Sequence, residues 1–142
     1  MRGICALFVA LFAVSPVLAN PADIEGTWLS GDGDGLIFIK LAGSSIVGRI
    51  LGSPDPDPER PTTDTQNPDP DLRNRALLGL EILQGFSYDG DGRWSGGEIY
   101  DPNSGKTYRC NLTLVDTNTL KVRGFIGIAL IGRTETWVRQ PD

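Results

Sequence analysis

Three consecutive residues, Gly105-Lys106-Thr107, match the end of the phosphate-binding loop of many nucleotide-binding proteins. That loop also requires a glycine five positions earlier and a helix directly afterwards, because glycine-rich backbone and a helix N-terminus together hold the phosphates. The earlier position is Tyr100, and residues 107–114 alternate between apolar and polar side chains, which is the period of a strand. The sequence therefore predicts a β-hairpin here, with its turn at residues 101–105.

Histidine is absent from the chain, which removes the commonest general base and the commonest zinc ligand. Two stretches of aspartate and glycine, residues 31–35 and 89–92, resemble the start of calcium-binding loops. Neither has oxygen-bearing side chains at the later positions that a calcium loop uses, where Leu36 follows the first stretch and Arg93 the second. Both stretches are typical of hairpin turns. We therefore expect neither a metal ion nor a cofactor.

Two glutamates, Glu98 and Glu135, are the remaining candidates for catalysis. A pair of carboxylates can hydrolyse glycosidic bonds when the two groups lie about 5–9 Å apart. The sequence contains no nucleophile motif and nothing that sets this distance. We therefore assign no catalytic residue and expect a protein that is not an enzyme.

The N-terminal residues are typical of a secretory signal peptide. Arg2 precedes an apolar run at residues 4–14, and a stretch with small residues ends at Ala19. A membrane anchor is the alternative, but the run is shorter than the roughly 20 residues that a spanning helix needs. We expect a signal peptide at residues 1–19 and one mature domain at residues 20–142, exported to the periplasm or secreted and not spanning the membrane.

Charge and cysteine content narrow the classes of partner. The net charge is −5 and lysine and arginine do not cluster, which argues against nucleic acid, because its binding requires clustered positive charge. Cys5 lies in the predicted signal peptide, so Cys110 is the single cysteine of the predicted mature chain. Since Leu112 and Leu114 follow Cys110 at the period of a strand, we expect a buried thiol, with a dimer bridge or a reactive thiol as alternatives.

Short segments of strand-forming residues fill the predicted mature domain, and turn residues separate them. Tight turns between successive strands require antiparallel neighbours, and eight such strands can close into a barrel that has no exposed edge. We therefore predict an all-β fold, an antiparallel up-and-down barrel of eight strands. The strands are expected at residues 26–30, 36–42, 45–51, 78–87, 93–100, 106–115, 119–127 and 131–139.

Residues 52–75 interrupt this pattern with repeated prolines. Proline removes backbone donors and is excluded from central strands, so we predict one long Pro-rich loop. Loops of this length are usually functional or mobile, and a solvated acidic linker is the other interpretation.

Several motifs in order resemble a bacterial family of small exported proteins, catalogued as domain of unknown function number two-one-four-seven. The motifs are Gly26-x-Trp28 and residues 67–83, 96–108, 123–127 and 136–139. The resemblance covers essentially the whole predicted mature chain. It implies a lipocalin-like barrel, export, and binding of a small apolar ligand. The proline-rich residues 55–61 depart from the family pattern, so the resemblance does not imply the geometry of the long loop.

Three residues look like the barrel-closing set of lipocalins, in which an arginine of the last strand packs over a tryptophan of the first. They are Gly26, Trp28 and Arg139. A guanidinium group stacked on an indole ring is a favourable contact. We expect a structural role for these residues rather than contact with a ligand.

The candidate ligand-binding residues follow from strand alternation. Trp137 is the largest apolar residue of the last predicted strand and is expected to face the barrel interior, together with Arg133 and Glu135 on the same face. The same reasoning places residues of the fourth and fifth predicted strands opposite them. The full candidate set is Arg133, Glu135, Trp137, Trp94, Glu98, Tyr100 and Gln84.

A pocket with these side chains is expected to bind a small apolar or amphiphilic molecule, and an anionic head group would pair with Arg133. Two alternatives remain. The interior could be narrow and packed, with Arg133 and a glutamate forming a structural ion pair. The protein could instead be a non-catalytic envelope module that binds a partner through residues 52–75 and the barrel exterior.

Overall fold

The computed structural model describes residue 9, residues 20–128 and residues 130–142. The predicted signal peptide at residues 1–19 lies outside the described residues, apart from residue 9. The described chain folds into β-strands with two short 3₁₀ helices. In chain order the elements are η1 (Pro21–Ile24), β1 (Gly26–Leu29), β2 (Leu36–Ala42), β3 (Ser45–Gly52), η2 (Pro70–Leu72), β4 (Glu81–Gln84), β5 (Ser87–Gly90), β6 (Arg93–Asp101), β7 (Lys106–Asp116), β8 (Thr119–Phe125) and β9 (Gly132–Arg139).

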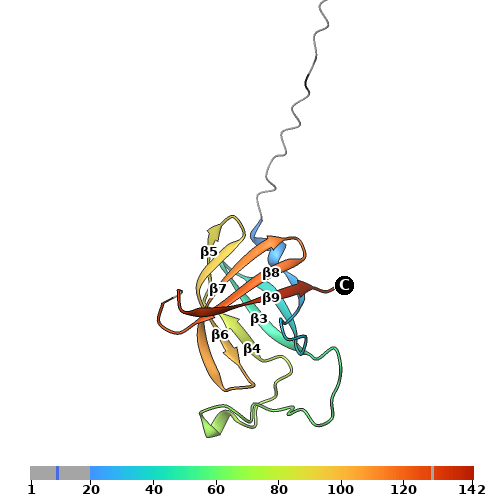
Figure 1. Ribbon diagram of the computed structural model, residues 1–142. Coiled ribbons are helices and arrows are strands. Elements are labelled where there is room, and N and C mark those ends of the chain that lie inside the picture. The colour runs from blue at the N-terminus through green and yellow to red at the C-terminus, as the bar shows by residue number, and fades with distance from the viewer. Residues whose placement is uncertain (1–8, 10–19, 129) are drawn as a thin grey trace, which may run out of the picture.

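The strands close into a barrel around one interior (Figure 1). The first and last strands, β1 and β9, pair antiparallel and bring Trp28 opposite Arg139. The other seam joins β4 to β6, where Leu83 lies opposite Ile99. β5 pairs with β6 beyond the end of β4, so β4 and β5 together fill one of eight strand positions. The predicted all-β, antiparallel, eight-stranded barrel is confirmed.

The predicted continuous strand at residues 78–87 is wrong, because Gly85 interrupts it. This glycine has a φ of +78°, a left-handed backbone conformation that a regular strand does not contain. The interruption separates β4 from β5, and it puts Gln84 and Phe86 in different environments. Gln84 is exposed, whereas Phe86 is buried in the core.

The turns follow the chemistry of their residues. Residues 91–92 join β5 to β6, and Asp91 adopts a φ of +53°, which aspartate tolerates better than most residues. Residues 102–105 join β6 to β7, so Lys106 and Thr107 lie in a strand and no helix follows them. The predicted hairpin is confirmed in place of a phosphate-binding loop.

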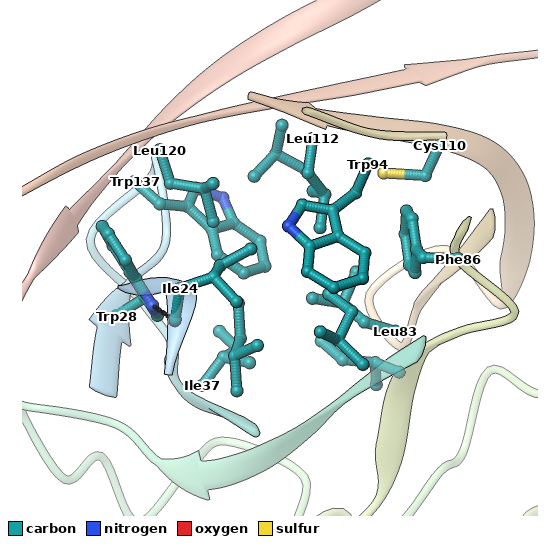
Figure 2. Close-up of a cluster of buried hydrophobic side chains, with 14 residues drawn as sticks. Ile24, Trp28, Ile37, Leu83, Phe86, Trp94, Cys110, Leu112, Leu120 and Trp137 are labelled. Carbon is teal, nitrogen blue, oxygen red and sulfur yellow. Dashed lines mark hydrogen bonds between the residues drawn. The ribbon is translucent and has the colours of Figure 1, made fainter. Parts of the chain in front are cut away.

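One end of the barrel is filled by large side chains that point at one another from different strands (Figure 2). Trp28 and Trp94 are fully or almost fully buried, and η1 covers this end with Ile24. Cys110 lies in the same cluster with no exposed surface, so its predicted burial is confirmed. Loss of contact with water raises the pKa of the Cys110 thiol to about 12.

Arg139 seals this end from outside. Its guanidinium carbon lies 4.4 Å from the centre of the Trp28 ring system, and the guanidinium donates hydrogen bonds to backbone oxygens of Asp23, Glu25 and Thr117. Gly26 makes room for it, because a Cβ atom there would lie 2.5 Å from Nη1 of Arg139. The predicted structural role of these residues at the barrel seam agrees with this arrangement.

Among the described residues, no helix is both long and apolar enough for a membrane crossing.

Candidate ligand-binding site

The opposite end of the barrel opens into a cavity of about 1340 Å³. The connections β1–β2, β3–β4, β6–β7 and β8–β9 surround its mouth, and residues from all four line it. Below the mouth, apolar side chains from several strands form the wall. These are Ile37, Ile50, Ile82, Ile99, Val122 and Trp137. Small-molecule sites in proteins are typically smaller, at roughly 300–1,000 Å³, and have a similar mixture of an apolar wall and a few polar groups.

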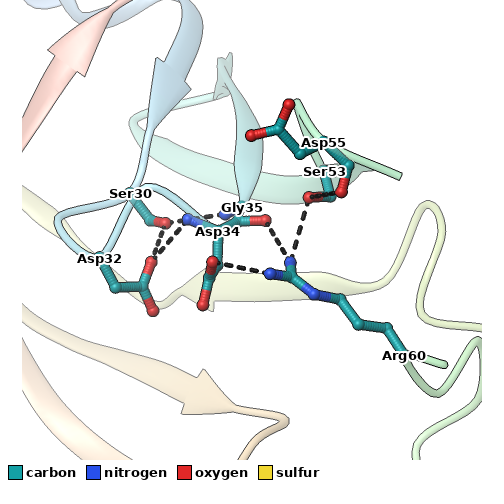
Figure 3. Close-up of polar contacts among 7 residues, drawn as sticks. All are labelled: Ser30, Asp32, Asp34, Gly35, Ser53, Asp55 and Arg60. Carbon is teal, nitrogen blue, oxygen red and sulfur yellow. Dashed lines mark hydrogen bonds and ion pairs between the residues drawn. The ribbon is translucent and has the colours of Figure 1, made fainter. Parts of the chain in front are cut away.

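Arg60 of the β3–β4 connection joins two neighbouring loops at the rim of the mouth (Figure 3). Its guanidinium forms an ion pair with Asp34 at 2.8 Å and donates a hydrogen bond to the hydroxyl of Ser53 at 3.1 Å. Asp34 belongs to the β1–β2 turn, which Ser30 and Asp32 brace by a hydrogen bond of 2.6 Å between their side chains. Arg60 therefore fastens the long β3–β4 connection to the β1–β2 turn.

A second fastening lies on the other side of the long connection, at Asp64. Its side chain has no exposed surface, although it carries a charge. It accepts hydrogen bonds from the Tyr100 hydroxyl at 2.6 Å, from Nδ2 of Asn67 at 2.8 Å and from Nε of Arg75 at 2.8 Å. Arg75 also lies over the Tyr100 ring, 5.4 Å from its centre. The network attaches residues 64–75 of the connection to the end of β6.

Two groups of the second fastening, Asp64 and Tyr100, have shifted pKa values. Burial alone would raise the pKa of Asp64, but the hydrogen bonds from Tyr100, Asn67 and Arg75 outweigh it and hold the pKa below its usual value. Burial and the adjacent Asp64 carboxylate raise the pKa of Tyr100. Tyr100 and Arg75 therefore hold a carboxylate that is ionised at neutral pH.

Four of the predicted site residues line the cavity: Arg133, Glu135 and Trp137 on β9, and Tyr100 at the end of β6. Trp137 is buried in the wall, Glu135 is partly buried, and Arg133 is exposed at the mouth. Glu135 accepts a hydrogen bond of 3.3 Å from Nε1 of Trp137. The ion pair considered between Arg133 and a glutamate is not among those formed by the described residues.

The other three candidates, Trp94, Glu98 and Gln84, do not line the cavity, which corrects the predicted arrangement. Trp94 points inward but is packed in the core against Tyr88, at a ring-centre distance of 4.7 Å, and does not line the cavity. Glu98 and Gln84 lie opposite each other on the exposed side of the β4–β6 pair. They line a separate outer groove of about 410 Å³. Tyr100, at the end of β6, borders both the cavity and this groove.

A β-bulge on β6 explains the wrong side assignment. Trp94 lies opposite Leu112 and Gly97 lies opposite Cys110. Between these two pairs β6 advances by three residues while β7 advances by two, so β6 contains one extra residue. The extra residue shifts the alternation by one position. Trp94 therefore points inward, whereas Glu98 points outward. Glu98 and Glu135 do not line the same cavity, so they do not form the carboxylate pair considered for hydrolysis.

The sequence predicts no role for Asp64, Arg75 or Arg60 at the site. They lie in a stretch that contains many acids and prolines, where no spacing distinguishes a buried aspartate from a solvated one. Among the described residues, no group of three histidine, cysteine, aspartate or glutamate side chains is placed to hold a metal ion.

Comparison with known proteins supports the barrel fold through structure and not through curated sequences. No curated protein sequence matches the chain. The chain is similar in structure to protein HP1028 from the human pathogen Helicobacter pylori, which is described as belonging to the lipocalin family. The two chains share 22% identity, the match covers 83% of each chain, and the TM-score is 0.75. The model of a family described as "uncharacterized protein conserved in bacteria (DUF2147)" matches residues 26–139. The chain therefore belongs to the DUF2147 family.

Proposed function

We propose that this protein binds a small apolar or amphiphilic molecule inside the barrel, and that it does so outside the cytoplasm. The observation that carries the proposal is the cavity of about 1340 Å³, which has an apolar wall and opens at one end. An interior that served only as a core would be filled by side chains, as the opposite end of the barrel is.

Apolar side chains at the mouth support the same proposal. Ile126, Ile131 and Leu78 line the cavity and are exposed over 70%, 72% and 69% of their surfaces. Large apolar side chains that remain this exposed at the entrance of a cavity gain from being covered by an apolar ligand. The apolar wall and these exposed side chains line the same cavity.

A binding role without catalysis is part of the proposal. The chain has no histidine, and Glu98 and Glu135 line different hollows. The pair of Glu98 and Glu135 considered for glycoside hydrolysis is therefore not assembled in one site.

Substitution of Gly124 tests the cavity directly. A Cβ atom at Gly124 would lie 3.6 Å from Cβ of Tyr108 and 3.9 Å from Cγ2 of Ile99, which are ordinary contact distances, and Gly124 lines the cavity. Gly124→Leu should therefore fill part of the cavity without distorting β8. The probe is decanol, titrated while the fluorescence of the tryptophans, including Trp137, is recorded.

The parent protein should respond saturably to decanol, and Gly124→Leu should bind it at least about tenfold more weakly. Thr136→Leu is the matched control, because it adds the same side chain at an exposed position on β9. No saturable response of the parent to decanol would overturn the proposed function. Equal weakening by both leucine variants would show that the effect does not come from the cavity.

Export is the second part of the proposal, and it rests on the sequence of residues 1–19. Expression of the full chain in a bacterial host, followed by intact mass measurement of the periplasmic fraction, should give a protein that begins at Asn20. A product that retains Cys5 would contradict cleavage after Ala19.

An envelope interaction module is the second candidate function. The β8–β9 connection presents Ile128 and Leu130 at 60% and 87% exposure, beyond what a ligand in the cavity would cover. Ile128→Ser combined with Leu130→Ser separates the two functions, because both residues are exposed and neither lines the cavity. A pocket protein should retain decanol binding after this change, whereas an interaction module should lose its envelope partner in a crosslinking experiment.

A further inference from the structure

We propose that the cavity selects amphiphiles whose polar end is positively charged, and that Glu135 is the residue that holds this end. The inference rests on the proposed function, because it assigns the chemical class of the ligand in the same cavity. It reverses the expectation from the sequence, in which Arg133 would favour an anionic head group.

The charges of the lining residues are unbalanced. Among the described residues, five carboxylates and two guanidinium groups line the cavity. The carboxylates belong to Asp32, Asp34, Asp57, Asp101 and Glu135, and the guanidinium groups belong to Arg60 and Arg133. A hollow with low-dielectric walls and an excess of one sign concentrates ions of the opposite sign. The mouth therefore attracts cations and repels anions.

The two arginines are poorly placed to reverse this balance. Arg60 already forms an ion pair with Asp34 at 2.8 Å, which neutralises its charge. Arg133 is exposed at the mouth, as Asp32 and Asp57 are, so water and salt screen all three charges, whereas the partly buried Glu135 is screened less. An anionic head group would have to lie beside Arg133 while four aspartates line the same cavity.

Glu135 is the carboxylate that lies among the apolar side chains of the wall. It is opposite Val122 on β8 and two residues from Trp137 on β9, and both of these neighbours are buried. Gly31 of the β1–β2 turn lies against it, since a Cβ atom there would be 2.9 Å from Cβ of Glu135. This packing holds the carboxylate at the boundary between the apolar wall and the mouth.

Glu135 has acceptor capacity that the protein does not use. Its recorded hydrogen bond comes from Nε1 of Trp137 at 3.3 Å, and a carboxylate can accept several. It belongs to none of the three ion pairs found in the described part of the chain. An ammonium group beside Glu135 would supply the missing positive charge and donors, with its alkyl chain against the apolar wall.

The experiment compares three probes with the same ten-carbon chain: decylammonium, decanol and decanoate. Each is titrated into the purified protein at pH 7 and low ionic strength, below its aggregation concentration, by calorimetry and by tryptophan fluorescence. The parent protein should bind decylammonium at least about tenfold more tightly than decanoate, with decanol between them. Added salt should reduce this preference, because screening weakens the attraction between charges.

Glu135→Gln removes the charge and keeps an oxygen that can accept from Trp137. It should weaken decylammonium binding roughly tenfold and leave decanol binding within about twofold of the parent. Glu98→Gln is the matched control, since it makes the same change on the exposed face outside the cavity. Glu98→Gln should leave the order of the affinities for the three probes unchanged.

Decanoate binding as tight as decylammonium binding in the parent would overturn the inference while the proposed function stands. Unchanged decylammonium affinity in Glu135→Gln would overturn the assignment to Glu135. If none of the probes binds the parent, the proposed function itself fails. Retained decanol binding shows that Glu135→Gln is folded, and the salt dependence of the parent tests the preference without any variant.

Discussion

The hydroxyl of Tyr100 donates a hydrogen bond of 2.6 Å to the buried carboxylate of Asp64. The two residues are far apart in sequence, and this bond joins the end of β6 to the long connection between β3 and β4. A buried carboxylate requires partners that replace the water it has lost, and Asp64 has three. The bond therefore determines where the connection lies beside the cavity mouth.

Tyr100→Phe should destabilise the protein, because it removes one of the donors to a buried charge. Hydrogen bonds to charged groups contribute about 1.5–3 kcal/mol, so a decrease of this size in the free energy of unfolding is expected. Chemical denaturation at pH 7 measures it. Tyr88→Phe is the comparison, because the Tyr88 hydroxyl accepts a bond of 3.1 Å from the backbone nitrogen of Gly92. A hydrogen bond between neutral groups contributes about 0.5–1.5 kcal/mol, so the larger loss should belong to Tyr100.

Acid should weaken the same network. The pKa of Asp64 in the folded protein lies below its ordinary value of 3.8, so the unfolded state takes up a proton first as the pH falls. The stabilisation is therefore fully present above about pH 4 and is lost as the pH falls through the lower, folded-state pKa. Asp64→Asn should be less stable than the parent at pH 7, and the difference in melting temperature should shrink between pH 5 and pH 2. A difference that stays constant over this range would mean that the Asp64 carboxylate is not stabilised by its neighbours.

Arg139→Met tests the seam of the barrel. The change removes the stacking on Trp28 and the hydrogen bonds to three backbone oxygens. We expect a loss of about 2–4 kcal/mol in the free energy of unfolding, together with a change in the emission of Trp28. Arg109→Met is the control, because Arg109 is exposed on β7, and it should change stability by less than about 0.5 kcal/mol. Similar losses in both variants would show that arginine content, and not the seam, affects stability.

Much of the barrel could be predicted because its determinants are local. Period-two alternation and the turn residues at 31–35, 91–92 and 102–105 specify antiparallel neighbours one after another. Trp28 and Arg139 could be paired from the sequence because the lipocalin resemblance supplies a contact between the first and last strands.

The inward faces of β4 and β6 could not be predicted, since two backbone irregularities override the alternation. The residues around Gly85 give no sign of a break in the strand, yet the positive φ of Gly85 divides the predicted strand in two. The bulge between Trp94 and Gly97 depends on the register with β7, which is a property of two strands. For this reason Arg133, Glu135 and Trp137 were placed correctly on a regular strand, whereas Glu98 was not.

Cys110 should be unreactive in the folded protein. Burial raises the pKa of its thiol to about 12, so very little thiolate exists at pH 8, and reagents cannot reach the sulfur. An aromatic disulfide reagent should label the native protein slowly and label it at once after denaturant is added. Peptide mapping assigns the label to Cys110 and separates it from Cys5 in any uncleaved chain. Rapid labelling of Cys110 in the native protein would contradict its place in the core.

Arg60→Gln should change the rate at which a ligand leaves the cavity more than it changes the stability of the fold. The Arg60–Asp34 ion pair is about half exposed, and exposed pairs contribute about 0–1 kcal/mol. The ion pair nevertheless fastens the long connection to the β1–β2 turn at the rim of the mouth, and Ser53 of the same connection accepts a further hydrogen bond from Arg60. Without them the mouth should open more often, so decanol should dissociate several-fold faster in a stopped-flow displacement experiment while the melting temperature changes little. Arg49→Gln provides the control, because the Arg49–Glu81 pair is similarly exposed and its residues do not line the cavity. An equal acceleration in both variants, or none in Arg60→Gln, would show that the ion pair at the mouth does not control exchange.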